Sequence, residues 1–197
     1  MYYLVALGNP GKEYRETRHN IGQLVMDKVR AELGMTNFFS SRTYHGQIAT
    51  GVCGWEEVQL FFPDTFMNES GGAVAKFVPK RDFSKLIVIA DEVDLPLGQL
   101  KVSVARGDGG HNGIASIIRS LGSNEFVRIR LGIAGSHPET GAAVRPDGAR
   151  LAKFVLGTFT AKEMKVVESL TERVAAVIIT ICTEGASAAM NKFNVKG

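Results

Sequence analysis

Three polar residues in this sequence have side chains suited to acid–base chemistry or hydrogen bonding. His19 lies in the tetrapeptide Thr-Arg-His-Asn, and an unperturbed imidazole, which titrates near pH 6.5, accepts a proton at neutral pH. Asp91 is the first of three acidic residues in Asp-Glu-Val-Asp. These carboxylates could bind a metal, orient a histidine or cap a strand, and we favour orientation because no loop offers the spacing of converging oxygen ligands. Asn9, in Gly-Asn-Pro-Gly, offers both a donor and an acceptor. A lone histidine is more often structural than catalytic, so the position of His19 in the predicted elements must show which role it has.

The first predicted elements place His19 at the end of a strand. Residues 2–7 are β-branched, aromatic or aliphatic, which predicts a buried strand, and Gly8-Asn9-Pro10-Gly11 predicts the turn that ends it. An amphipathic run predicts a helix over residues 21–33, with Asn20 as its N-cap. Ligands in open α/β sheets bind at this end of the strands. The turn has neither a phosphate-loop ending nor a dinucleotide fingerprint.

The next stretch predicts an antiparallel hairpin and a helix. Residues 42–53 and 57–62 form the two strands, joined by Gly54-Trp55-Glu56. The helix runs to residue 77, with Asp64 or Thr65 as its cap. Gly71 and Gly72 disfavour a helix, so we expect another strand or a ligand to approach the backbone there.

The second half of the chain predicts strands over residues 85–90, 100–105 and 126–133. The glycine-rich loop 107–113 precedes a helix over 114–121, with Asn112 as N-cap, and would suit either an anion or a simple connection. Arg128 and Arg130 fall on one face of the last strand, as a phosphate clamp or as solvated edge residues. Residues 134–150 predict a long mobile loop that acts as a lid. A capping box at Thr160 and Glu163 opens a long helix that ends at Gly185, followed by an amphipathic segment over 186–193.

Composition indicates one α/β domain spanning residues 1–197. The chain is 22% charged and 45% hydrophobic with a net charge of +3, which is ordinary for a soluble globular protein. Residues 101–153 hold eight basic and four acidic residues, a distribution that suits phosphate binding. Cys53 and Cys182 have no metal-binding spacing and predict buried reduced thiols. We find no signal peptide and no apolar run of membrane-spanning length, and we therefore expect a cytoplasmic protein.

Five motifs in this order resemble those of bacterial peptidyl-tRNA hydrolases. They are Leu-Gly-Asn-Pro-Gly, Thr-Arg-His-Asn, Thr-Phe-Met-Asn-x-Ser-Gly, Asp-Glu-x-Asp-Leu-Pro-x-Gly and Gly-Gly-His-Asn-Gly. The resemblance covers nearly the whole chain, although Ala90 and Ser103 depart from the family's usual pattern. It implies a single α/β domain with a twisted mixed sheet between helices. It also implies cleavage of the ester that joins a peptide to the terminal ribose of tRNA.

The resemblance also implies roles for individual residues. His19 corresponds to the general base, Asp91 to the residue that keeps that histidine oriented and basic, and Asn9 to the asparagine that distinguishes N-blocked from free aminoacyl-tRNA. The remaining matches are substrate contacts at Tyr14, Phe66, Asn68 and Asn112, and a tRNA-facing basic residue at Arg130.

These roles suggest direct attack by water. No serine or cysteine lies in a nucleophile motif, so His19 would activate water, and Asn68 would steady the peptide or the oxyanion. We expect no cofactor or metal, no membrane partner, and a monomer. The main alternative is a non-catalytic RNA-binding protein on the same fold. A third possibility is a small-molecule hydrolase or nucleotide-binding enzyme that uses the loop 107–113.

Overall fold

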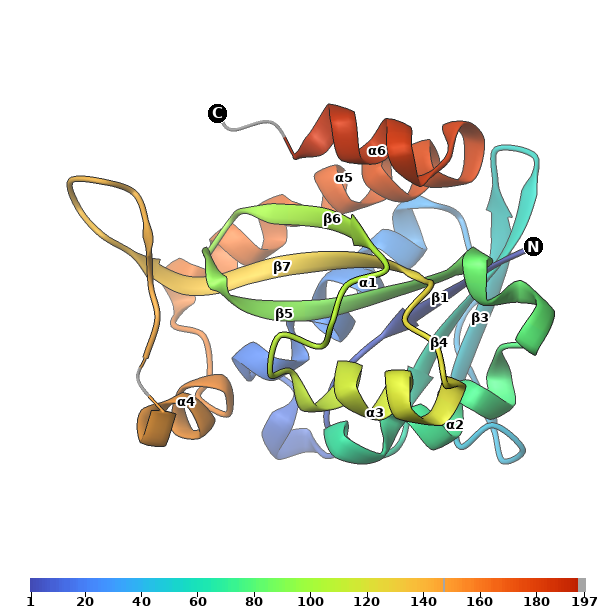
Figure 1. The fold of residues 1–197 in the computed structure, drawn as a ribbon, viewed down its shortest axis with the longest axis horizontal. Helices are drawn as coiled ribbons and strands as arrows, with labels where there is room; N and C mark the ends of the chain where they lie inside the picture. The colour runs from blue at the N-terminus through green and yellow to red at the C-terminus, as the bar shows by residue number, and fades with distance from the viewer. Residues whose placement is uncertain (147, 195–197) are drawn as a thin grey trace.

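The computed structural model describes residues 1–146 and 148–194, which build an eight-stranded mixed sheet flanked by helices (Figure 1). Seven strands follow the order β2-β3-β4-β1-β5-β7-β6, and β8 pairs with β7. The central strand β1 pairs in parallel with β4 and β5, and β5 pairs in parallel with β7, while the other pairings are antiparallel. The strands are β1 (Tyr2–Ala6), β2 (Phe39–Ser41), β3 (Gly46–Cys53), β4 (Glu56–Pro63), β5 (Leu86–Pro96), β6 (Leu100–Val104), β7 (Val127–Ser136) and β8 (Ala143–Val144).

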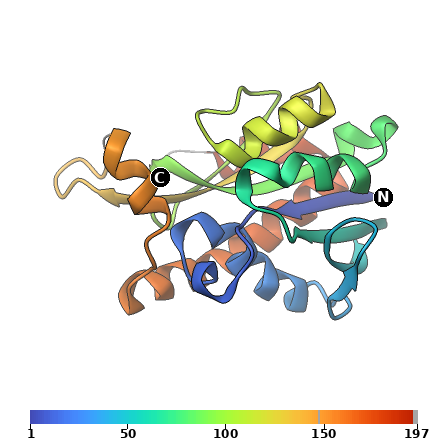
Figure 2. The same cartoon turned by 90° about the horizontal axis from the view of Figure 1, so that it is seen from below.

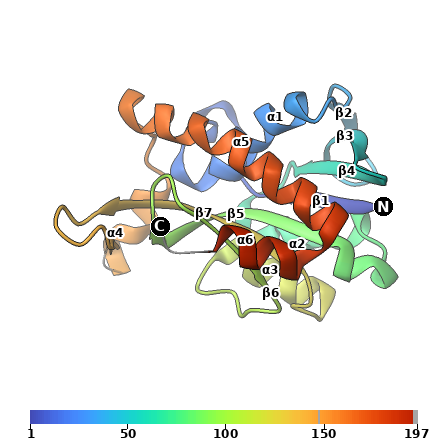
Figure 3. The ribbon, with the colours of Figure 1, turned by 90° about the horizontal axis from the view of Figure 1, so that it is seen from above.

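Helices cover both faces of the sheet, as the two edge-on views show (Figures 2 and 3). On β1, Leu4 and Ala6 pack into the core shared with α1, α5 and α6. The alternate residues Tyr3 and Val5, with Leu7 just after the strand, pack against α2 and α3 on the opposite face. The strand is therefore apolar on both faces, as expected of a buried parallel strand. The helices are α1 (Ile21–Glu32), α2 (Ser70–Phe77), α3 (Asn112–Leu121), α4 (Gly148–Val155), α5 (Ala161–Glu184) and α6 (Ala186–Phe193).

Most predicted elements are confirmed, including the hairpin of β3 and β4 and the tail helix α6. The capping box of α5 is present, because the Thr160 hydroxyl accepts from the Glu163 amide at 3.3 Å and the Glu163 carboxylate accepts from the Thr160 amide at 2.7 Å. Cys53 and Cys182 are buried free thiols. Within the described residues, no helix is both long and apolar enough to cross a bilayer.

Three predicted boundaries are wrong. The first hairpin strand begins at Gly46 rather than residue 42, because β2 and a turn take up the preceding residues. The run of acidic residues belongs to β5, which continues to Pro96 through an irregularity in its pairing with β7. The segment 134–150 is not one long loop: β7 extends to Ser136 and pairs with β8, and α4 begins at Gly148. Residue 147 lies outside the described residues.

The predicted cap of α2 is also wrong. A 3₁₀ turn over Met67–Glu69 precedes α2, and neither Asp64 nor Thr65 caps it. The Met67 amide instead donates to Asn9, which comes from the end of β1. Of the two glycines in α2, only Gly71 is approached closely: a Cβ there would lie 2.1 Å from the Ser116 carbonyl oxygen of α3, whereas a Cβ on Gly72 would meet nothing within 4 Å.

Candidate active site

The candidate active site lies where the carboxyl ends of β1 and β5 meet the start of α1. His19 sits in a 3₁₀ turn over Arg18–Asn20 that leads directly into α1. The helix approaches the strands closely at Gly22, where a Cβ would lie 2.7 Å from the Ile89 carbonyl oxygen. Because only glycine permits this approach, the turn that carries His19 is held against β5, which carries Asp91 shortly before the irregularity in its pairing with β7.

His19 and Asp91 form a buried hydrogen-bonded pair. The Nδ1 atom of His19 lies 2.7 Å from Oδ1 of Asp91, and the two side chains are 11% and 3% exposed. A carboxylate in this position accepts the Nδ1 proton, which leaves Nε2 of His19 as the nitrogen that can take a proton from a reactant. The predicted pairing of an imidazole with an orienting carboxylate is therefore present in the structure.

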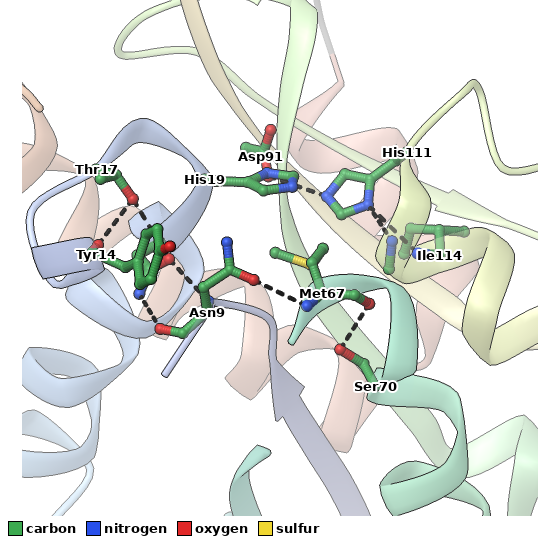
Figure 4. A network of polar contacts seen from close by, with 11 residues as sticks. Asn9, Tyr14, Thr17, His19, Met67, Ser70, Asp91, His111 and Ile114 are labelled. Atoms are coloured by element: carbon green, nitrogen blue, oxygen red, sulfur yellow. Dashed lines mark hydrogen bonds and ion pairs between the residues drawn. The ribbon is translucent and has the colours of Figure 1, made fainter. Parts of the chain in front are cut away.

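A second histidine contacts the same carboxylate oxygen. The Nε2 atom of His111 lies 2.9 Å from Oδ1 of Asp91, and its Nδ1 atom accepts from the amides of Gly113 and Ile114 at 3.1 and 3.3 Å. Figure 4 shows His19, Asp91 and His111 together above Asn9 and Met67. We assign the His111 proton to Nε2 from this network, because Nδ1 faces two N–H donors. The predicted N-cap Asn112 is thus wrong: His111 caps α3.

The charges of this cluster shift the pKa values of Asp91 and His111. Burial alone would raise the pKa of Asp91, but His111 and His19 outweigh burial and hold it well below its usual range. Burial lowers the pKa of His111, whereas the Asp91 carboxylate raises it more, so the net shift is upward. The Gly113 and Ile114 amides oppose protonation of Nδ1, so the neutral Nε2–H tautomer satisfies all three contacts of the ring.

The same three residues are a candidate metal site. Within residues 1–146 and 148–194 they are the one cluster of three potential ligands whose ligand atoms lie within 4.8 Å of one another. A metal would need an unprotonated nitrogen from each ring at Asp91. In the assigned tautomer Nε2 of His111 carries a proton, which it would have to lose before it could bind a metal.

Asn9 is held on the opposite side of the site by backbone and side-chain contacts. Its Oδ1 accepts from the Met67 amide at 2.8 Å, which directs its Nδ2 away from that amide. Its backbone N–H donates to Oδ1 of Asn20, and its backbone oxygen accepts from Nδ2 of Asn20, both at 2.9 Å. Asn20 occupies the predicted N-cap position of α1, but its side chain makes no capping bond. Its side chain fixes Asn9 instead.

These residues line a cavity of about 480 Å³. Seven of the eight predicted site residues border it, and Tyr14 and Phe66 pack edge to face with ring centroids 6.3 Å apart. Helix α4 contributes an apolar wall through Leu151 and Val155, and Leu156 follows directly after the helix. Of the described residues in the predicted lid, 134–150, only Arg145 and Gly148 border the cavity. The seven predicted residues that line the cavity are Asn9, Tyr14, His19, Phe66, Asn68, Asp91 and Asn112.

The eighth predicted residue, Arg130, lies in a neighbouring cavity of about 470 Å³ beneath the loop 107–111. Its Nη1 atom contacts Oε2 of Glu92 at 2.9 Å. Arg128 borders the same cavity but is only 3% exposed and donates to the Gly107 carbonyl at 2.8 Å. The predicted alternative of two solvated edge residues is therefore wrong, because β6 covers this edge of β7.

Sequence reasoning assigned no site role to His111 or Asn20. Each was visible in a motif, Gly-Gly-His-Asn-Gly and Thr-Arg-His-Asn, beside a residue that was singled out. Local rules favour asparagine as an N-cap, so they selected Asn112 and Asn20 for that role. The contact of Asn20 with Asn9 joins residues 11 positions apart, and the contact of His111 with Asp91 joins residues 20 positions apart. The capping bonds of His111 are local, so there the preference for asparagine as a cap was misleading.

Fold and site together define an α/β protein with a histidine–carboxylate pair in a cavity at the carboxyl ends of parallel strands, an arrangement typical of an enzyme. The family model for peptidyl-tRNA hydrolase matches residues 3–197. The chain is 36% identical to the peptidyl-tRNA hydrolase of Syntrophotalea carbinolica, covering 98% of this chain and 97% of the relative. It is 38% identical to that of Caldanaerobacter subterraneus subsp. tengcongensis, covering 98% and 100%.

Solved structures agree with these matches. The crystal structure of peptidyl-tRNA hydrolase from Acinetobacter baumannii superposes with a TM-score of 0.84 at 28% identity, covering 99% of this chain and 95% of that one. The chain belongs to the peptidyl-tRNA hydrolase family, and its activity is the hydrolysis of peptidyl-tRNA.

Proposed function

We propose that this protein cleaves the ester of peptidyl-tRNA by means of a water molecule that His19 activates, without a metal or cofactor. The observation that carries the proposal is the 2.7 Å contact between His19 Nδ1 and Asp91 Oδ1. It fixes the tautomer in which Nε2 is free to accept a proton, and the buried carboxylate stabilises the imidazolium that results. Cleavage would free the tRNA from peptidyl-tRNA that stalled or aborted translation releases, so that the tRNA can be used again.

The reaction needs two proton transfers at Nε2 of His19. Nε2 takes a proton from water while the water oxygen attacks the ester carbonyl, which forms a tetrahedral oxyanion. The bond between the carbonyl carbon and the ribose oxygen then breaks, and the ribose oxygen takes the proton from the imidazolium. The amide hydrogens of Asn68, which borders the cavity, are placed to donate to the oxyanion or the peptide.

Asn9 is suited to distinguish a blocked from a free amino group. Its Oδ1 is occupied by the Met67 amide, so Nδ2 is the group left for the substrate. A donor at that point matches the carbonyl oxygen of an N-acyl group. A free ammonium offers only donors, so Asn9 and the ammonium would both lose a partner, a mismatch that costs about 1–3 kcal/mol, or roughly 5- to 150-fold in selectivity.

The remaining predicted residues would hold the tRNA and its ester-linked end. Tyr14, Phe66 and Asn112 border the main cavity, where rings and an amide suit a ribose, a base and a peptide. Arg130 borders the neighbouring cavity with Lys101 and Arg106, where basic side chains would bind phosphate. All these residues come from one chain, so a monomer suffices. We place the reaction in the cytoplasm, where translation supplies the substrate.

The test is hydrolysis of N-acetyl-aminoacyl-tRNA beside its unblocked form. The wild-type protein should cleave the blocked form selectively, and His19→Ala should lose at least about 100-fold in kcat/KM. His45→Asn is a matched control, because His45 is exposed with φ +56°, a conformation that asparagine tolerates. Binding of tRNA without cleavage by the wild type would favour the RNA-binding alternative, and full activity of His19→Ala would refute the assigned base.

Two further arms test selectivity and metal independence. Asn9→Asp keeps the acceptor for the Met67 amide but replaces the Nδ2 donor with a carboxylate oxygen. Its preference for the blocked substrate should fall about tenfold or more. Unchanged selectivity would refute the role of Asn9. Dialysis of the wild type against a chelator should leave its activity intact, and loss that Zn²⁺ or Mg²⁺ restores would refute the metal-free mechanism.

A further inference from the structure

We propose that His111 is a positioning residue for the reaction: it orients the Asp91 carboxylate and, by sharing Oδ1 with His19, limits how strongly Asp91 favours protonation of His19. This inference rests on the proposed role of His19 as the base. It assigns to His111 a function distinct from capping α3, although the same ring performs both.

The ring of His111 is fixed at both of its nitrogens. Nε2 donates to Asp91 Oδ1 at 2.9 Å, and Nδ1 accepts from the Gly113 and Ile114 amides. A flip of the ring about χ2 would replace each nitrogen by a carbon and break all three contacts. The position of Nε2, and with it the rotation of the Asp91 carboxylate, therefore depends on the first turn of α3.

Close packing beneath α3 keeps that turn in place. A Cβ on Gly113 would lie 2.5 Å from Met67 Sδ, 2.9 Å from Leu7 Cδ1 and 3.1 Å from Cε1 of His111. The absence of a side chain at Gly113 thus lets the helix start lie directly against the ring. The Gly71 amide donates to Ser116 Oγ at 3.0 Å, which ties α3 to α2 as well. The cap is therefore part of a rigid support.

Sharing of one oxygen has a predictable electrostatic consequence. Each N–H donor withdraws electron density from Oδ1, so a second donor weakens the pull of the carboxylate on the proton of His19. Removal of the His111 donor should strengthen that pull and shift the acidic limb of the kcat/KM profile to higher pH. Removal of the Asp91 charge should shift it the other way.

The other charged groups near His111 each have a partner of their own. Glu92, also on β5, is paired with Arg130 at 2.9 Å. Asp108, in the loop before α3, accepts from the Gly110 amide through its carboxylate and from the His111 amide through its backbone oxygen. His19 is the other titratable group beside the ring, with ring centroids 5.0 Å apart.

Two substitutions separate the two functions of His111. In His111→Asn, Oδ1 takes the place of Nδ1 and keeps the cap, but the side chain is too short to reach Asp91. In His111→Gln, the longer side chain can donate to Asp91 from Nε2 but loses the cap. Kinetics on N-acetyl-aminoacyl-tRNA from pH 5 to 9 and thermal unfolding are measured for both variants and for the His45→Asn control.

The proposal predicts opposite patterns for the two variants. His111→Asn should keep the Tm, lose about tenfold in kcat with little change in KM, and shift the acidic limb upward by about half a pH unit. His111→Gln should lose about 2–4 °C in Tm and keep the acidic limb of the wild type. Wild-type kcat and pH profile in His111→Asn would overturn the proposal, as would an equal limb shift in both variants.

Two further experiments test the role of His111 separately from effects on folding and from the proposed role of His19. In an Asp91→Asn background, His111→Asn should shift the acidic limb no further, because the shared charge is gone; a further upward shift would overturn the proposal. In the wild-type chain, ¹⁵N NMR should place the His111 proton on Nε2, and a proton on Nδ1 would also overturn it. If His19→Ala keeps full activity, the proposed base fails, whereas the NMR result still reports on His111.

Discussion

Substitution of Asp91 by asparagine isolates the charge of the carboxylate from its geometry. The two side chains have the same shape, and the amide oxygen of an asparagine can still accept from His19 Nδ1 and His111 Nε2, now 2.7 and 2.9 Å from Oδ1. The variant therefore removes the negative charge that would stabilise the imidazolium in the transition state. It leaves no buried charge unpaired.

The size of the effect follows from the separation and burial of the pair. A unit charge about 4 Å from the centre of the ring contributes about 4 kcal/mol at an effective dielectric constant of about 20. If half to all of this interaction is present in the transition state, kcat falls about 30- to 1000-fold. KM should change little, because the ground-state imidazole is neutral and gains less from the carboxylate.

The assay is steady-state hydrolysis of N-acetyl-aminoacyl-tRNA between pH 5 and 9, with thermal unfolding as a check on folding. The acidic limb of the profile should move to lower pH as kcat falls, because the variant no longer favours the protonated imidazole. A loss smaller than about threefold, or a loss confined to KM, would refute the claim that Asp91 acts through charge. A large fall in Tm would show that its role is mainly structural.

The remaining predictions concern stability. Asn20→Ala removes both partners of a buried backbone turn and should cost about 1–3 kcal/mol, measured by urea unfolding; an unchanged midpoint would contradict the role given to that side chain. Gly71→Ala should destabilise by about 1–3 kcal/mol because of the Ser116 carbonyl, whereas its control Gly72→Ala should be neutral or stabilising by up to about 1 kcal/mol. Equal effects would refute the close-approach argument. The lowered pKa of Asp91 stabilises the fold above about pH 4, its unfolded value, and this contribution is lost as pH falls further; Asp91→Asn should therefore show a weaker acid dependence of unfolding below pH 4 than the wild type.

The sequence alone determined the elements whose signals are local. The apolar run before Gly8 predicted β1, and the capping box at Thr160 predicted the start of α5, because both depend on neighbouring residues only. The ordered motifs, through the family they resemble, also identified seven of the residues that border the main cavity. The site needs an imidazole, a carboxylate and amides near the ends of strands. Residue types and their spacing along the chain are therefore enough to predict such a site.

The tertiary structure alone decided how those residues are connected. Local propensity predicted that the Asn20 side chain would cap α1 and gave His111 no role, but Asn20 binds the backbone of Asn9 and His111 binds Asp91. A polar side chain takes whichever partner the fold brings within about 3 Å, and contacts between distant residues leave no local signal. The shared oxygen of Asp91 is such a contact: β5, the turn before α1 and the start of α3 must all be in place before two histidines can meet one carboxylate.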